Sequence, residues 1–346
     1  MYNPVKIIIS IKDCPLTRSV SKILLSLIIY ASFASIAFAR APFSSMQEQE
    51  VLEKVQDSEP KTPPSKKTTN EVVDEAFNDT MLAAKINNER EANRNLYSLV
   101  QHSQNYILPL SYSSGPNSIT LDGIGEETID KFEAKYQISV KTPLWLQEDD
   151  VSGIYFGFTA VSFWQLYNNA TSKPFRETNY EPEVFYQFNS NLSLLGYKFN
   201  LFRIGINHMS NGQSGLKSRS WNRIIATALF SDKNTAYYLK TWYRLPEDDK
   251  ISLLDPLGDD NPDINDYYGR VELGFGYQLG GLAITSRIRN NLSFKNNRSG
   301  VEINVTYPIN KRYDFLLQYF NGYGDSLIDY NRHQQRISAG MQVRFL

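Results

Sequence analysis

The chain has 346 residues, of which 41% are hydrophobic and 13% aromatic, and its formal net charge is −1. Such a balanced charge offers no basic excess for nucleic acid, so we expect no nucleic-acid partner. Its three histidines, His102, His208 and His333, are too few and too scattered for a histidine-rich metal site. Abundant tyrosine and phenylalanine favour strands over helices.

Residues 1–39 have the features of a secretory signal peptide. An apolar run at residues 23–39 ends in Ala-Phe-Ala and follows four basic residues, Lys6, Lys12, Arg18 and Lys22. This order of charge, apolar run and small residues predicts export and cleavage, and an N-terminal membrane anchor is the alternative. The single cysteine, Cys14, would be removed with this segment, so we expect no disulfide.

Residues 40–94 form a polar N-terminal extension that we expect to be partly disordered. Residues 41–70 are polar and contain Pro60, Pro63 and Pro64, which is typical of a tether. The following stretch, 71–92, favours a short amphipathic helix with Val73, Phe77 and Ala84 on one side. That helix is either part of the tether or a docking element.

From residue 95 to residue 346 the pattern changes to strands. In residues 301–307 and again in 337–345, apolar and small side chains alternate with polar ones, which indicates strands with one apolar and one polar face. Twelve strands are predicted, near 103–113, 133–145, 152–165, 180–189, 193–210, 218–230, 235–245, 266–278, 282–291, 299–309, 312–321 and 336–346.

The connections between these strands alternate between short and longer segments, which predicts an all-β, twelve-stranded antiparallel transmembrane β-barrel. Outer-membrane barrels have tight turns on the inner side and larger loops outside. No run of about 18 apolar residues follows position 40, so no transmembrane helix is expected. A secreted β-sandwich would show the same alternation within strands and is the competing fold.

A membrane barrel also predicts where particular side chains lie. Aromatic residues near strand ends would form a girdle at the membrane surfaces; they are Trp145, Tyr155, Trp164, Trp242, Tyr267 and Tyr319. Charged residues on the polar face would pair inside the barrel. They are Arg203, Arg223, Arg287, Arg289, Glu272 and Glu302.

Three polar residues interrupt the apolar face of two neighbouring strands. His208 and Ser210 continue the parity of Ile204 and Ile206, and Asn222 shares the parity of the apolar positions of the next strand. Polar groups on a lipid-facing surface are unfavourable unless they are paired with one another or needed for function. The alternative is that they are ordinary polar residues at the rim of a barrel.

These residue types form a nucleophilic set. A serine becomes reactive when a base takes its proton, and a histidine can do so near neutral pH. Asn222 can accept a hydrogen bond from the second ring nitrogen of His208 and so orient the imidazole. Because asparagine is neutral, it stabilises the imidazolium less than an aspartate would.

The segment around these residues, Asn207-His208-x-Ser210-Asn211-Gly212-x(5)-Ser218-Arg219-Ser220-Trp221-Asn222-Arg223, resembles the active-site segment of the outer membrane phospholipase A family. Three further blocks resemble the same family, at residues 174–182 (PFRETNYEP), 259–264 (DDNPDI) and 322–331 (GYGDSLIDYN). The resemblance covers residues 95–346.

The resemblance implies a twelve-stranded barrel in the bacterial outer membrane that hydrolyses phospholipids and lysophospholipids, with the site near the outer leaflet. It implies calcium-dependent phospholipase A1 and A2 activity, activated by homodimerisation. By the same likeness, Ser210 is the nucleophile, His208 the base, Asn222 the orienting residue and the Gly212 N–H an oxyanion donor. Calcium would be bound by Ser172, Gln213 and Ser218, with Asp260 near a second, weaker site.

Four positions depart from the family's pattern. Gly215 stands where an acidic residue is common near the second calcium site, and Gln213 replaces an arginine. Ala160 replaces a glutamine of the dimer interface, and the chain ends in Leu346 rather than phenylalanine. The competing functions are a non-enzymatic barrel, such as a small channel or adhesin, and a secreted soluble hydrolase.

Overall fold

A computed structural model describes most of the chain beyond residue 79. The described residues are 80–95, 98–116, 129–169, 175–190, 192–194, 197–252, 255 and 258–344. The predicted signal peptide and most of the polar extension therefore lie outside them. Among the described residues, no helix combines the length and the apolar character needed to span a membrane.

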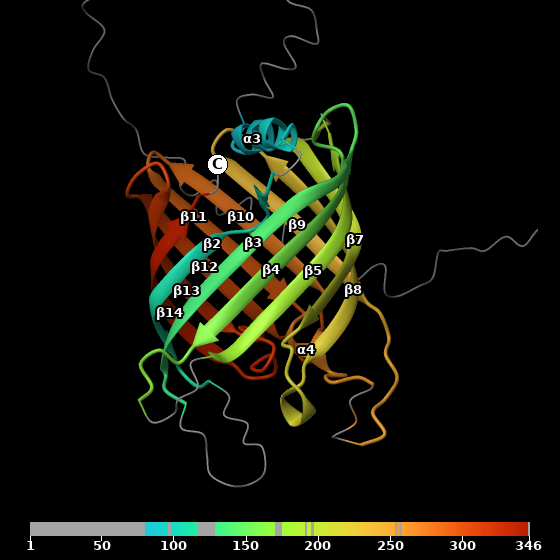
Figure 1. Ribbon diagram of the computed structural model, residues 1–346, viewed down its shortest axis with the longest axis vertical. Coiled ribbons are helices and arrows are strands. Elements are labelled where there is room, and N and C mark those ends of the chain that lie inside the picture. The colour runs from blue at the N-terminus through green and yellow to red at the C-terminus, as the bar shows by residue number, and fades with distance from the viewer. Residues whose placement is uncertain are drawn as a thin grey trace, which may run out of the picture. The chain divides into compact units, whose positions relative to one another are not determined.

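Twelve long antiparallel strands form a closed barrel, as the sequence predicted (Figure 1). They are β2 Asn105–Ser113, β3 Phe132–Leu146, β4 Gly153–Trp164, β5 Phe175–Asn189, β7 Tyr197–Ser210, β8 Ser220–Ser231, β9 Thr235–Arg244, β10 Val271–Leu279, β11 Leu282–Asn290, β12 Ser299–Pro308, β13 Tyr313–Gly322 and β14 Gln334–Val343. Two short strands, β1 Val100–Gln101 and β6 Ser193–Leu194, pair with β3 and β7.

Each long strand pairs with the long strands before and after it, and the first and last close the ring. The closing pair is β2–β14, in which Ile337 lies opposite Tyr112. This single closed sheet rules out the two-sheet sandwich. The predicted alternation of connections is also confirmed, because β10 and β11 are joined by residues 280–281 alone, whereas 245–270 separate β9 from β10.

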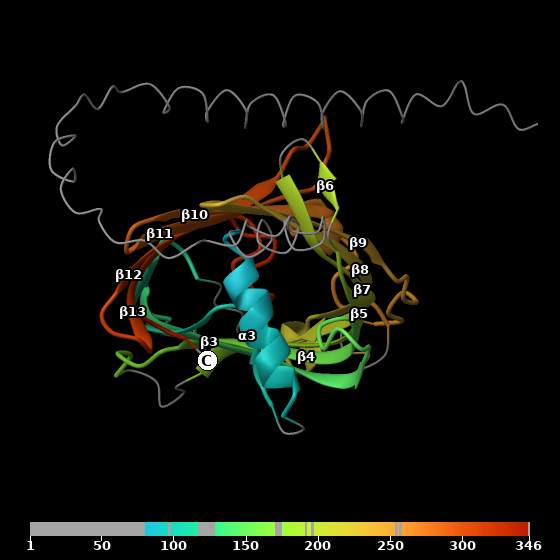
Figure 2. The ribbon, with the colours of Figure 1, turned by 90° about the horizontal axis from the view of Figure 1, so that it is seen from above.

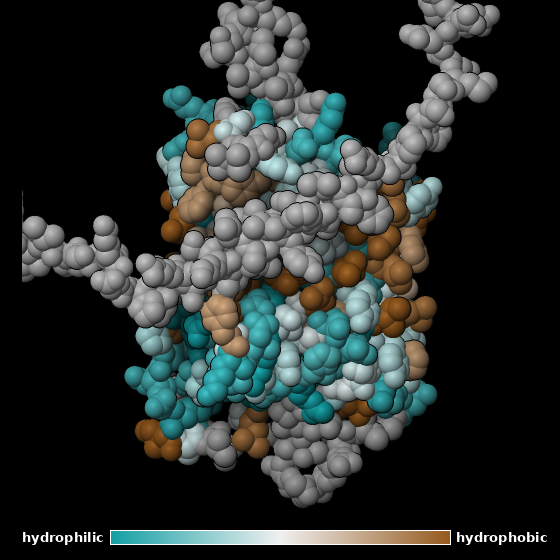
Figure 3. Space-filling view, turned by 180° about the vertical axis from the view of Figure 1, so that it is seen from behind, coloured by the Kyte–Doolittle hydropathy of each residue, from teal (hydrophilic) through white to brown (hydrophobic). Residues whose placement is uncertain are grey.

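Side chains alternate between the two faces of the barrel wall, as strand geometry requires. Along β13, Phe315, Leu317 and Tyr319 are exposed on the outside, whereas Leu316 and Gln318 between them are buried. In the face of Figure 3, hydrophobic residues gather in the upper part of the wall, and hydrophilic residues dominate its lower centre.

The predicted aromatic girdle is only partly correct. Trp145 and Tyr319 are exposed on the outer surface, but Tyr155 and Trp242 are buried. Tyr155 faces inward, where its hydroxyl lies 2.9 Å from Nδ2 of Asn93. Trp242 packs against Trp221 in a cluster of buried residues that also contains Met209. Position near a strand end does not determine which face a ring occupies.

Charged side chains pair inside the barrel, as the polar face predicted. Arg287 lies 2.7 Å from Glu302, and Arg289 lies 3.9 Å from Glu272. Arg223 instead bonds with Glu181, a partner that the sequence did not suggest. A buried charge is tolerated only when it is paired, so the interior is a network of ion pairs and hydrogen bonds.

The helix α3, Ala83–Asn93, lies across one opening of the ring (Figure 2). Of the residues predicted to form its apolar side, Val73 and Phe77 lie outside the described residues. The third, Ala84, is exposed, so that prediction is wrong. Its buried face includes Ala83, Ile86 and Glu89 instead.

Glu89 fixes this helix to the barrel through the buried Lys141 of β3. The carboxylate accepts hydrogen bonds from Lys141 Nζ at 2.5 Å and Gln187 Nε2 at 2.8 Å. Burial alone would raise the pKa of Glu89, but the charges of Lys141 and Arg203 hold it at about 2. The helix is therefore docked by a buried ion pair together with the apolar contact of Ile86.

Replacing Glu89 by alanine should release α3 from the barrel. The substitution leaves the Lys141 ammonium buried without its carboxylate, which costs about 3 kcal/mol or more. Hydrogen exchange of the α3 amides should accelerate about 100-fold. Glu91→Ala removes the same charge from an exposed position of the same helix and is the control. Equal exchange rates in the two variants would contradict this account of docking.

Candidate functional site

The three candidate catalytic residues lie together where β7 ends and β8 begins. His208 is the cross-strand partner of Asn222, and Ser210 is the partner of Ser220. Their neighbours of the same parity, Ile206 and Ile224, are exposed on the outer surface, which confirms the outward face predicted from parity. This end of the barrel carries the longer loops and lies opposite α3 (Figure 1).

A hydrogen bond joins the side chains of His208 and Asn222, with 2.8 Å between Nδ1 and Oδ1. Because an amide oxygen only accepts, Nδ1 carries the hydrogen, and Nε2 of the neutral ring is free to take a proton. The other end of the amide supports this assignment, since Asn222 Nδ2 donates to Glu247 Oε1 at 3.2 Å. The imidazole is thus held in the tautomer that a general base needs.

Ser210 follows His208 by two residues on the same face of β7. Both side chains are half-buried. The structure does not join them by a hydrogen bond; such bonds are often long in an enzyme without substrate and tighten when substrate binds. Between them, Met209 points inward and packs with Trp221 and Trp242, which anchors this part of the strand.

The loop between β7 and β8 is closed at its base and organised by Asn211. The backbone N–H of Asn211 donates to the carbonyl of Arg219, and its side-chain oxygen accepts from the N–H groups of Gln213 and Arg219. Gly212 has φ +64, a left-handed conformation that suits glycine. Among the described residues, none accepts a hydrogen bond from its N–H.

Of the residues predicted to bind calcium, the structure brings two into this loop and one beside it. Gln213 and Ser218 flank the short helix η1, Gly215–Lys217, and Ser218 Oγ donates to Asp260 Oδ2 at 2.7 Å. Ser172 lies outside the described residues. In the described part of the chain, no group of three or more His, Cys, Asp or Glu is arranged to hold a metal ion.

The carboxylate of Asp260 already has partners from this chain. Its Oδ1 lies 2.5 Å from Nζ of Lys250, and its Oδ2 accepts from Ser218 and Ser220. Partial burial raises the pKa of Asp260, but the hydrogen bonds and charge of Lys250 outweigh burial and lower it. Lys250 was not singled out from the sequence, because it lies ten residues away in the loop between β9 and β10.

Residues from three blocks that are distant in sequence support the loop between β7 and β8. Glu177 of β5 accepts hydrogen bonds from Asn211 Nδ2 at 3.2 Å and Gln213 Nε2 at 2.9 Å. Its neighbour Arg176 lies 2.8 Å from Asp329, in the connection between β13 and β14. The segment at 259–264 contacts the start of β8, where Asn261 Oδ1 accepts a hydrogen bond from the N–H of Ser220.

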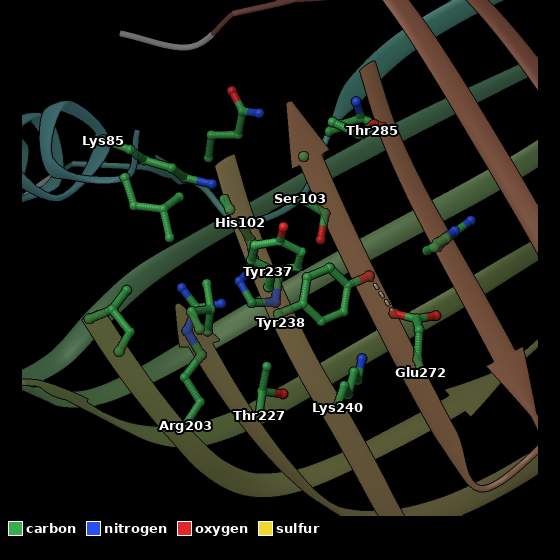
Figure 4. A pocket seen from close by; sticks show the side chains of 18 of the residues that line it. Lys85, His102, Ser103, Arg203, Thr227, Tyr237, Tyr238, Lys240, Glu272 and Thr285 are labelled. Atoms are coloured by element: carbon green, nitrogen blue, oxygen red, sulfur yellow. Dashed lines mark hydrogen bonds between the residues drawn. The ribbon is translucent and has the colours of Figure 1, made fainter. Parts of the chain in front are cut away.

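A second candidate site is a cavity of about 370 Å³ inside the barrel (Figure 4). It is lined by Lys85 of α3 and by charged residues of the wall, among them Arg203, Lys240 and Glu272. None of the residues predicted from the sequence to act in catalysis or bind calcium lines it. The site at the β7–β8 end is therefore distinct from the lumen.

Comparison with known proteins agrees with this geometry. A sequence model of the family described as phospholipase A1 matches residues 82–343. The phospholipase A1 of Klebsiella pneumoniae is 36% identical over 256 residues, which cover 73% of this chain and 84% of that protein. The phospholipase A1 of Escherichia coli K12 is 34% identical over 264 residues, covering 75% of this chain and 86% of that protein.

Two solved structures are similar in fold. The outer membrane phospholipase A of Escherichia coli superposes with a TM-score of 0.65 at 34% identity, covering 72% of this chain and 100% of that one. An outer membrane phospholipase of Salmonella typhi, a dimer with bound calcium, gives a TM-score of 0.66 at 33% identity, covering 75% of this chain and 96% of that one.

The geometry predicts that Ser210 is the reactive serine and that its reactivity depends on His208. With a fluorophosphonate reagent, His208→Ala should slow labelling of Ser210 by about 10²-fold or more, because the general base is lost. His333→Ala removes an exposed histidine of another outer loop and is the control. Labelling of the His208→Ala protein at the wild-type rate would exclude His208 as the base.

Proposed function

The chain belongs to the phospholipase A1 family, and on that premise we propose that it hydrolyses the sn-1 and sn-2 acyl ester bonds of phospholipids and lysophospholipids. Ser210 is the nucleophile, His208 the base and Asn222 the residue that orients it. The observation that carries this assignment is the hydrogen bond between His208 Nδ1 and Asn222 Oδ1, two residues from a serine on the same outward face.

The reaction begins when Oγ of Ser210 attacks the carbonyl carbon of an acyl ester while Nε2 of His208 takes the hydroxyl proton. The oxyanion that forms accepts a hydrogen bond from the N–H of Gly212. When this intermediate collapses, His208 gives the proton to the leaving oxygen of the lysophospholipid, and the acyl group remains on Ser210. Water, deprotonated by His208, then releases the fatty acid and restores the serine.

The chain is an outer-membrane protein, and we place its site near the outer leaflet. The last strand, β14, ends at the α3 end, where the connections between strands are short (Figure 1). In outer-membrane barrels the short turns face the periplasm and the longer loops lie outside. Ser210 and Asn222 lie at the end with the longer loops, on the surface that meets lipid, within reach of the ester groups of outer-leaflet lipids.

We propose that calcium supports this reaction and is bound by Ser172, Gln213 and Ser218. Carbonyl and hydroxyl oxygens are ligands suited to this hard cation, and Gln213 and Ser218 belong to the loop that Asn211 closes beside Ser210. Calcium held there would stabilise the negative charge that develops on the ester oxygen during the reaction. The Salmonella relative contains bound calcium, which supports the assignment.

The second, weaker calcium site near Asp260 fits this chain less well. Gly215 offers no carboxylate, and the carboxylate of Asp260 is paired with Lys250. The Lys250 ammonium supplies positive charge at the position where a second cation would be expected. We therefore propose that the site binds one calcium ion rather than two.

We also propose that the active form is a homodimer. Ile204 and Ile206, beside the triad, are exposed on the outer surface, and a second barrel would cover them and form a cleft for acyl chains. Ala160 lies on the outward face of β4, in line with the exposed Ile154 and Phe156. The Salmonella relative is a dimer, which supports this assembly.

Ser210→Ala should abolish phospholipid hydrolysis in a correctly folded barrel. Loss of the nucleophile should lower the release of fatty acid from phospholipid in detergent micelles with calcium by about 10³-fold or more. Heat-modifiable migration in a gel provides the check that the variant is folded. Release at the wild-type rate by the folded variant would refute the proposed function.

Lys250→Ala should strengthen binding of the one proposed calcium ion because it frees the Asp260 carboxylate, which contacts the proposed calcium ligand Ser218. An added anionic ligand raises the affinity of an oxygen site, here by about tenfold. Titration calorimetry of the folded protein in detergent, in the Ser210→Ala background, measures this without turnover. Lys295→Ala removes the same charge from an exposed position in another outer loop. Unchanged affinity in Lys250→Ala would show that Asp260 has no part in calcium binding.

A further inference from the structure

Glu247 reaches the site from a loop that no sequence pattern connects with catalysis. It follows β9 by three residues, in the connection between β9 and β10. The N–H of Leu245 donates to the carbonyl of Asn222 at 2.8 Å, which extends the pairing of β8 and β9 beyond Arg244. Glu247 lies two residues beyond Leu245, and its Oε1 accepts from Asn222 Nδ2.

The position of Glu247 is fixed on both sides. Before it, Arg244 bonds with Asp259 at 2.5 Å and with the carbonyl of Pro262. After it, the carbonyl of Asp248 accepts from the N–H of Asp259 at 2.8 Å. Each of these contacts ties the segment that carries Glu247 to the segment that carries Asp259.

We propose that Glu247 is a positioning residue of the triad, which holds the amide of Asn222 with its oxygen toward His208 and adds the negative charge that asparagine lacks. This inference rests on the proposed function, because it requires that His208 becomes an imidazolium during the reaction. One carboxylate, one amide and one imidazole then form a chain of hydrogen bonds that ends beside Ser210.

The charges around Glu247 determine when it is ionised. Partial burial and the nearby Asp259 carboxylate raise the pKa of Glu247, Asp260 acts in the same direction, and Arg244 opposes them. A glutamate with a raised pKa loses its charge earlier as the pH falls, so its support of the imidazolium is present at neutral pH and is lost in mild acid.

The test separates the charge of Glu247 from its hydrogen bond. Glu247→Gln keeps an oxygen that can accept from Asn222 but removes the charge, and Glu247→Ala removes both. For Glu247→Gln we expect kcat to fall roughly threefold to tenfold with KM within about twofold, because the charge acts on the imidazolium and not on bound substrate. The acidic limb of the pH profile of kcat/KM should move to lower pH by roughly half a unit to one unit.

Asp249→Asn removes a charge from an exposed position of the same segment and is the matched control. It should leave kcat and the pH profile unchanged. Glu247→Ala should lose more activity than Glu247→Gln, because the amide of Asn222 can then rotate. A profile of Glu247→Gln that coincides with those of wild type and Asp249→Asn would overturn the proposal.

A measurement without turnover distinguishes failure of this inference from failure of the proposed function. In the Ser210→Ala background, the ring nitrogens of His208 are titrated by nitrogen NMR with and without Glu247→Gln. A titration midpoint that moves to lower pH supports the proposal, and identical titrations overturn it. Hydrolysis that persists in Ser210→Ala would instead refute the assigned nucleophile, whatever the His208 titration does.

Discussion

Closure of the sheet between β2 and β14 is the constraint on which the other features depend. Within a bilayer, each backbone N–H and C=O must find its partner in the protein, and a ring of strands achieves this without an open edge. Closure also fixes the direction of each side chain, because successive residues of a strand point to lipid and to the lumen in turn. The outward direction of His208, Ser210 and Asn222 follows from it.

The same closure gathers charges in the interior, where they must pair with one another. Arg176, Glu133, Arg336 and Asp329 connect β5, β3, β14 and an outer loop in one buried network. Next to Arg176, Glu177 holds Asn211 and Gln213 of the loop that follows Ser210. The paired charges inside the barrel therefore support the loop that follows Ser210.

How far sequence could predict this arrangement depends on whether a residue lies in a periodic segment. The twelve strands and the outward parity of Ser210 follow from alternation. The proximity of His208 and Asn222 follows from the antiparallel pairing of two neighbouring strands near the loop that joins them. Glu247 and Lys250 lie in a loop without periodicity, and only the folded chain brings them to their partners, Asn222 and Asp260. The buried face of α3 could not be predicted for a related reason, since Glu89 is buried only because it pairs with Lys141 of β3.

Under the proposed function, the lipid-facing position of the triad also explains why its third member is neutral. An aspartate in place of Asn222 would set a charge among Ile206, Ile224 and lipid, where an ion without a close partner is costly. The neutral amide of Asn222 orients His208 at that depth. Glu247 carries the negative charge in the polar loop between β9 and β10, where the positive charge of Arg244 stabilises it. Orientation and charge, which a single carboxylate supplies in a soluble serine hydrolase, are divided here between two residues because the membrane surface separates the places where each is favourable.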